Sequence, residues 1–180
     1  MPAAGAAAAG RSAMEILRIL RHWMTTPGAV RRAFPEEVLT RIRQAIADSE
    51  KSHSGELRFA VEAALPLSYL RRDAPARERA EMMFSKLRVW DTDQNNGVLI
   101  YVELADHKIE IVVDRGIGGQ VPAAEWTSIA AMMRDRFRAG EFEAGALAGV
   151  EAAGAPLTRH YPLAAGERNP NELPDHPVIL

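Results

Sequence analysis

The sequence contains no cysteine, no long apolar run and little excess charge, and each of these absences excludes a class of protein. Without cysteine there are no disulfides, no thiolate nucleophiles and no zinc sites built from cysteine. No apolar run reaches the roughly 18–20 residues that a membrane-spanning helix needs. A net charge of −2 argues against bulk attraction to nucleic acid.

What is present is the composition of a globular domain. The chain has 180 residues, 47% apolar and 26% charged, which suits one domain with a sizeable core. Residues 1–13 are small and lack the charged start and leucine-rich core of a signal peptide, so we expect a cytoplasmic protein. We predict a flexible extension and basic amphipathic helix in residues 1–33, a main domain in residues 34–162 and an extended tail in residues 163–180.

The first predicted helix, residues 14–24, combines an apolar face with basic residues. Residues 11 to 32 hold five arginines and one glutamate, a local charge of +4. Such a helix can pack on its own domain, or it can lie on an anionic membrane or an acidic partner. Both readings remain open from the sequence.

Hydrophobic periodicity places the remaining elements. Apolar spacing predicts helices over residues 34–53, 76–90, 122–140 and 141–162, strands over 55–66, 97–104 and 108–114, a loop over 68–75 and a glycine-rich turn over 115–121. Residues 98–102 are apolar on both faces, so this strand should be buried on both sides. The order predicts an α/β fold, one small sheet between helices, with a further edge strand in the tail.

Polar residues gather beside two of these strands. Asp91, Asp93 and Asn95 alternate before the strand at 97–104, and Asp114 follows the strand at 108–114. A two-residue hairpin turn pairing Ala105 with Lys108 would set Leu99 opposite Asp114 and bring the two polar loops together. Carboxylates are ligands that calcium and magnesium prefer, so Asp91, Asp93 and Asp114 are the predicted metal ligands; an ordinary polar turn is the alternative.

Known motifs fit this region poorly. An EF-hand needs glycine at position six and glutamate at position twelve, where this chain has Asn96 and Val102. The sequence RGIGG (residues 115–119) is neither a dinucleotide-binding nor a P-loop motif. Glu50, His53 and Glu56 form a further cluster, which either shares a metal or places His53 at a helix C-terminus where it favours the dipole.

Several segments together resemble the TPM domain family. They are E-x-x-H-x-G-E (50–56), N-G-V-L-I-Y-V (96–102), E-I-V-V-D-R-G-I (110–117), Trp126, H-Y-P (160–162) and N-E-L-P-D (171–175). The resemblance implies a three-layer α/β/α sandwich around a small mixed sheet, with calcium or magnesium binding. Asp114 matches the aspartate at the strand end of the family motif.

The resemblance also implies two functions. The first is a weak metal-assisted phosphatase, in which the cation would neutralise phosphate charge and Arg115 would pair with phosphate oxygens. The second is a non-enzymatic accessory module for a membrane-associated protein complex, docking through the N-terminal helix and the tail. The sequence has no strong catalytic constellation, so it does not decide whether the protein is an enzyme.

Overall fold

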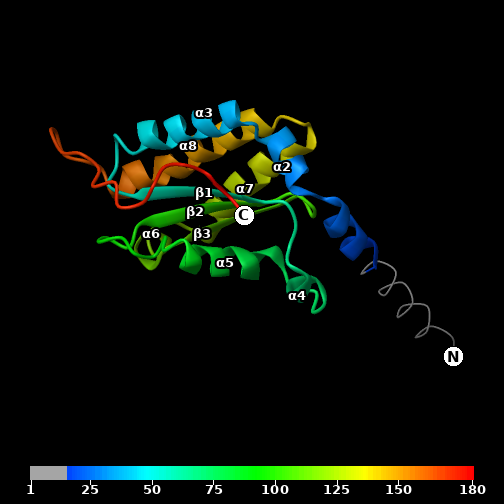
Figure 1. Cartoon of the computed structure of the whole chain (residues 1–180). Coiled ribbons are helices and arrows are strands. Elements are labelled where there is room, and N and C mark those ends of the chain that lie inside the picture. The colour runs from blue at the N-terminus through cyan, green and yellow to red at the C-terminus, as the bar shows by residue number, and fades with distance from the viewer. Residues whose placement is uncertain (1–15) are drawn as a thin grey trace.

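A mixed sheet of four strands lies between two layers of helices in the computed structural model, which describes residues 16–180 (Figure 1). The strand order is β3-β2-β1-β4. Strand β1 pairs in parallel with β2 and β4, and β2 pairs antiparallel with β3. The strands are β1 (Glu56–Glu62), β2 (Gly97–Glu103), β3 (Lys108–Val113) and β4 (Val178–Ile179).

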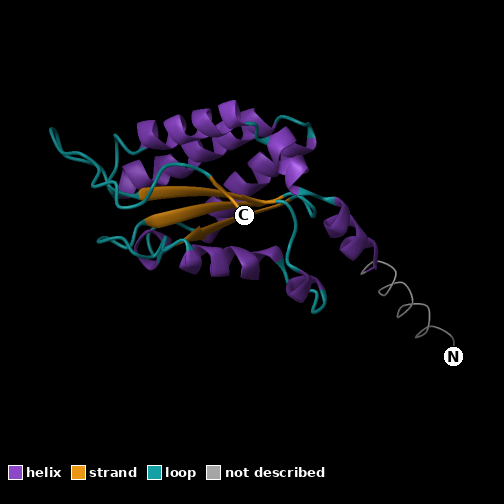
Figure 2. Ribbon diagram, viewed as in Figure 1, coloured by secondary structure: helices purple, strands orange, loops and turns teal. Residues whose placement is uncertain are grey.

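Helices α3, α7 and α8 cover one face of the sheet and α5 covers the other, so the fold is an α/β/α sandwich (Figure 1 and Figure 2). Residues 16–24 are also helical. The others are α2 (Pro27–Ala33), α3 (Glu36–Ser49), α4 (Leu67–Leu70), α5 (Ala76–Lys86), α6 (Arg115–Gly118), α7 (Ala123–Arg138) and α8 (Phe142–His160).

The predicted helices and strands are confirmed, with shorter bounds than the sequence suggested. Two predictions need correction, because the loop at 68–75 and the turn at 115–121 overlap the four-residue helices α4 and α6. The edge strand expected in the tail is β4, which pairs with β1. The predicted extension at residues 1–13 lies outside the described residues.

Strand β2 is buried along its whole length, as predicted. Val98, Ile100 and Val102 face the core beneath α3, α7 and α8, whereas Leu99 and Tyr101 pack in the second core on the α5 side. The alternation follows from the two-residue period of a strand. A strand covered on both faces needs apolar side chains at every position, which explains the run VLIYV.

The predicted hairpin register was wrong by two residues. Val98 pairs with Val113 and Glu103 pairs with Lys108, so Gly97, and not Leu99, lies beside Asp114. The turn is longer because the Glu103 carboxylate accepts hydrogen bonds from the N–H groups of Ala105 (2.8 Å) and Asp106 (2.9 Å). A shift of two residues keeps every side chain on its predicted face.

None of the helices within residues 16–180 has the length and apolar character needed to cross a membrane.

Candidate functional site

The loop before β2 and the loop after β3 meet at one end of the sheet. The Gly116 N–H donates to the Asn95 carbonyl at 2.9 Å, and the Asp114 N–H donates to the Gly97 carbonyl at 2.9 Å. The Arg115 Nε–H donates to Asn95 Oδ1 at 3.0 Å. These bonds confirm that segments 91–96 and 114–119 converge, despite the corrected register.

Asp114 has one satisfied and one unsatisfied carboxylate oxygen. Its Oδ1 accepts a hydrogen bond from the Arg115 N–H at 2.7 Å and so caps α6. Its Oδ2 is buried and has no hydrogen-bond partner in the part of the chain that the structure describes. Burial of a carboxylate oxygen without a hydrogen-bond partner lowers the stability of the fold. A bound ion or water is the usual explanation for such an oxygen in a folded protein.

Two neighbouring strand ends each hold a further oxygen of this kind. The Asn96 side chain donates through Nδ2 to the Ser54 carbonyl at 3.2 Å, which leaves its buried Oδ1 without a partner among residues 16–180. Glu56 starts β1 opposite Gly97, and its buried Oε1 is also without a partner there. Each of these oxygens is of the kind that a hard cation takes as a ligand. Glu56 pairs with Gly97 on the α5 face of the sheet, whereas the alternation along β2 directs Asn96 to the opposite face, so Glu56 is not assigned to the same ion.

Asp91 and Asp93 lie on the exposed side of the same loop. The Asp91 carboxylate forms an ion pair with Arg88, and the Asp93 N–H donates to Glu172 Oε1 at 3.1 Å. Among the described residues, the one group of three His, Cys, Asp or Glu ligand atoms within 4.8 Å of one another lies elsewhere. The assignment of Asp91, Asp93 and Asp114 as shared ligands therefore stays a prediction.

The cluster Glu50, His53 and Glu56 is bound to separate backbone and side-chain partners. His53 Nδ1 lies 3.0 Å from the Gly55 carbonyl and Nε2 lies 3.0 Å from Ser49 Oγ, so both ring nitrogens have protein partners. Glu50 Oε1 accepts from the Leu57 N–H at 2.9 Å. Burial lowers the His53 pKa to about 4, so the imidazole is neutral at pH 7 and does not supply the charge that a dipole interaction would need.

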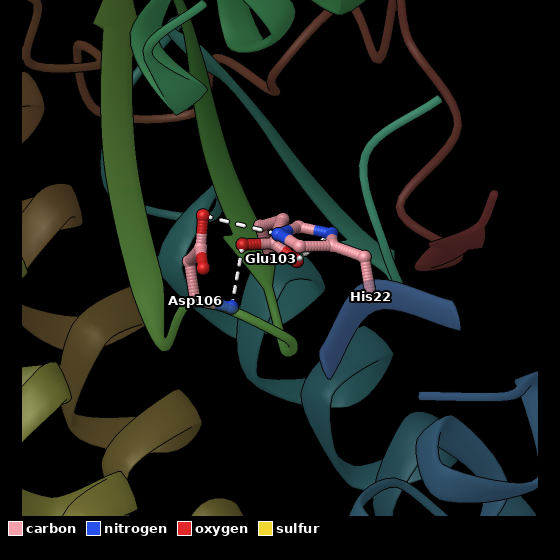
Figure 3. Close-up of side chains that lie close together, drawn as sticks. All are labelled: His22, Glu103 and Asp106. Carbon is pink, nitrogen blue, oxygen red and sulfur yellow. Dashed lines mark hydrogen bonds and ion pairs between the residues drawn. The ribbon is translucent and has the colours of Figure 1, made fainter. Parts of the chain in front are cut away.

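A second cluster, which the sequence analysis missed, lies at the opposite end of β2. His22, Glu103 and Asp106 bring three potential ligand atoms within 4.8 Å of one another (Figure 3). His22 Nε2 lies 3.1 Å from Asp106 Oδ2, and Nδ1 lies 3.7 Å from Glu103 Oε1. His22 is far in the chain from Glu103 and Asp106, so no motif of fixed spacing identifies the cluster.

Protein donors already occupy most of this cluster. Asp106 pairs with the guanidinium groups of Arg18 and Arg21, and both Glu103 oxygens accept backbone N–H groups. His22 Nδ1 accepts from the Leu65 N–H at 3.0 Å, which leaves the ring proton on Nε2. This buried Nε2 lies near Asp106 but forms no hydrogen bond within the described residues.

The charges around this cluster also disfavour a cation. Burial, and then the charges of Arg18 and Arg21, lower the His22 pKa to about 4. The same two guanidinium groups would repel a metal ion placed among these side chains. We therefore interpret the cluster as a tether that holds the helix at residues 16–24 to the β2–β3 turn.

Comparison with protein families matches the TPM domain over residues 31–155. The sequence has no match among the curated proteins compared.

Two solved structures share the fold. The BA42 protein from the psychrophilic bacterium Bizionia argentinensis is 30% identical, with a TM-score of 0.69, over 80% of this chain and 93% of BA42. The N-terminal domain of a P. gingivalis protein is 18% identical, with a TM-score of 0.56, over 71% of this chain and 81% of that domain; this likeness concerns the fold alone. The family match and the likeness to BA42 together show that this chain belongs to the TPM domain family.

Proposed function

We propose that the chain is a divalent-cation-binding TPM domain that holds calcium or magnesium where segments 91–96 and 114–119 meet. The observation that carries the proposal is Asp114 Oδ2, a buried carboxylate oxygen without a hydrogen-bond partner in the described part of the chain. The similar state of Asn96 Oδ1 on the adjacent strand end supports it. Hard divalent cations prefer such carboxylate and carbonyl oxygens.

Asp114 and Asn96 would hold the cation, with Asp91 and Asp93 as the neighbouring carboxylates that we also propose as ligands. When bound, a divalent cation supplies positive charge for phosphate oxygens and polarises water. Arg115 is exposed on the same loop, and its guanidinium group has donors beyond the one directed at Asn95. A weak metal-assisted phosphatase activity is the reaction that this arrangement supports, in a protein that we place in the cytoplasm.

Thermal unfolding of the full chain tests the cation site. Millimolar calcium or magnesium should raise the Tm relative to chelator, because a ligand that binds only the folded state stabilises it. Asp114→Asn should abolish this increase, since the amide keeps an oxygen to cap Arg115 but loses the charge. Asp135→Asn, on an exposed site of α7, is the matched control and should respond like the unmodified protein. Identical melting curves in metal and in chelator for the unmodified protein would contradict the proposal.

The helix at residues 16–24 supports a second candidate function, a docking module for a membrane-associated complex. Its outward face carries five large apolar side chains, from 45% exposed at Leu20 to 81% exposed at Trp23. The others are Ile16, Leu17 and Met24. Exposed apolar side chains gathered on one helix mark an interaction surface.

The tail contributes less to docking than the sequence suggested. Leu173, within N-E-L-P-D, is buried, and its N–H donates to Glu56 Oε2 at 3.0 Å. Because this segment packs on the domain, we confine the docking proposal to the helix at residues 16–24.

Cosedimentation with lipid vesicles tests this second function. The full chain should sediment with phosphatidylglycerol vesicles more than with phosphatidylcholine vesicles, because Arg31 and Arg32 are exposed just after the apolar face. Trp23→Ser should reduce binding, whereas Trp90→Ser, a matched exposed tryptophan outside this helix, should not. Equal loss in both variants would argue against docking through this helix.

A further inference from the structure

A groove of about 410 Å³ follows strand β3 between α5 and α7. Four residues of β3 line it, together with Arg77 from α5 and Trp126, Ala130 and Arg134 from α7. Strand β3 is the last strand in the sheet order and pairs on one side with β2. The groove therefore runs beside the open edge of the sheet.

Alternate backbone groups of β3 face this groove. The Asp114 N–H donates to the Gly97 carbonyl, so alternate residues back along β3, namely 112, 110 and 108, direct their backbone groups toward β2. Ile109, Ile111 and Val113 then direct theirs outward. The bond from Arg77 Nη1 to the Ile111 carbonyl, at 2.6 Å, confirms this direction.

The groove combines an apolar floor with two arginines, Arg77 and Arg134, and the carboxylate of Glu110. Arg77 already forms an ion pair with Glu81 at 2.8 Å. Ile109, Ile111 and Trp126 are buried along it. The Trp126 indole N–H is buried without an acceptor, and the Arg134 side chain has no ion pair or hydrogen bond, both within residues 16–180. An unpaired donor and an unpaired cation beside a strand edge are complementary to a chain that offers carbonyl groups and carboxylates.

We propose that this groove binds an extended acidic peptide segment of a partner protein, which adds to the sheet beside β3. Strand addition satisfies the outward backbone groups other than the Ile111 carbonyl, which already accepts from Arg77, and pockets on the groove receive alternate side chains of the incoming strand. The apolar floor takes apolar side chains, and Arg134, which has no ion pair within residues 16–180, takes a carboxylate.

Charge favours a peptide over a second copy of this chain. In a two-fold β3–β3 pair, α5 of one copy would lie in the same layer as α5 of the other, and α7 would meet α7. The unpaired Arg134 of each copy would then approach that of the other, whereas a peptide carboxylate at this position would attract it.

Amide chemical shifts of ¹⁵N-labelled full-length protein test the proposal with synthetic octapeptides. An end-blocked peptide of alternating valine and glutamate should shift the amides of Ile109, Ile111 and Val113 and the Trp126 indole signal. Arg134→Glu should weaken binding by about tenfold or more, because it reverses the charge that meets the carboxylates. Arg43→Glu, an exposed arginine on α3 away from the groove, should leave binding unchanged.

Two control peptides separate strand addition from other modes. A valine–lysine peptide should not bind, and a valine–glutamate peptide with N-methylated alternate amides should lose binding because it cannot donate to the strand edge. Equal binding of either control would overturn the proposal, as would the absence of shifts at millimolar valine–glutamate peptide. Concentration-dependent shifts of the same amides without peptide would instead assign the edge to a second copy of the chain.

Discussion

At the scale of single residues, Glu50 shows how burial sets the pH dependence of stability. Its side chain is buried at the end of α3, and burial raises its pKa to about 8 from 4.5. The folded protein therefore binds this proton more tightly than the unfolded chain does. The stabilisation is complete below the unfolded pKa and is lost as the pH rises toward 8.

Replacement of Glu50 by glutamine should remove this pH dependence. Glutamine keeps an oxygen to accept the Leu57 N–H but has no proton to lose. We expect the variant to be more stable than the unmodified protein at pH 9, by up to a few kcal/mol, and similar in stability at pH 4.5. Urea unfolding at a series of pH values measures this. Glu37→Gln, on the exposed face of the same helix, is the control, and an equal change in both variants would contradict the assignment.

Gly97 is a residue where the backbones come too close for a side chain. A Cβ at this position would lie 1.9 Å from the Val89 carbonyl oxygen, whereas a Cβ at Gly28 would meet nothing nearer than 3.4 Å. Gly97→Ala should therefore lower the free energy of unfolding by ~3 kcal/mol. Gly28→Ala in α2 should raise it by about 0.5–1 kcal/mol. Denaturant titration of both variants checks the contrast, and a neutral Gly97→Ala would show that the loop before β2 can move aside.

At the scale of elements, the helix at residues 16–24 is held to the domain by polar contacts of its inward face. Arg18, Arg21 and His22 contact Asp106 in the β2–β3 turn, while the apolar face points outward. The attachment is therefore more electrostatic than that of the helices that pack on the sheet. It should weaken when Asp106 loses its charge.

Asp106→Asn should release this helix and leave the sheet intact. The Asp106 side chain is 6% exposed, but Arg21 is half exposed, so we expect a cost of ~1–3 kcal/mol. Asp73→Asn is the control, because Asp73 is 70% exposed and contacts Arg18 alone of these residues. Amide hydrogen exchange should become faster at residues 16–24 in Asp106→Asn and change little in Asp73→Asn. Unchanged protection in both would show that apolar contacts hold the helix.

The long, periodic elements could be predicted from the sequence, and the short ones could not. Helices α3, α7 and α8 have clear apolar stripes, and the run VLIYV predicted the buried central strand. Helices α4 and α6 have four residues each, too few to show a period. The hairpin register failed because the Glu103 carboxylate closes a longer turn, which is a side-chain effect that strand patterns do not contain.

The candidate site could be predicted only in part, because strand patterns do not contain the partners that side chains find. Sequence spacing indicated that the loops carrying Asp91 and Asp114 converge, because hairpin pairing alone brings them together. It did not indicate that Asn96 contributes an unsatisfied oxygen, since this depends on which partners its side chain finds. The cluster of His22, Glu103 and Asp106 depends on the docking of a helix from far away in the chain.

At the scale of the whole molecule, the sheet has two polar ends with different chemistry. The end at Gly97 and Asp114 holds buried oxygens without partners in the described residues, whereas the end at Glu103 and Asp106 has its carboxylates paired with arginines and backbone N–H groups. A cation should therefore bind at the first end. The competing account places the cation at the second end, beside His22.

Amide shifts of the full-length protein during a calcium or magnesium titration decide between these ends. The account predicts saturable shifts confined to residues 91–97 and 114–119, which disappear in Asp114→Asn. Shifts centred on residues 103–106 and His22, or no shifts at millimolar cation, would contradict it.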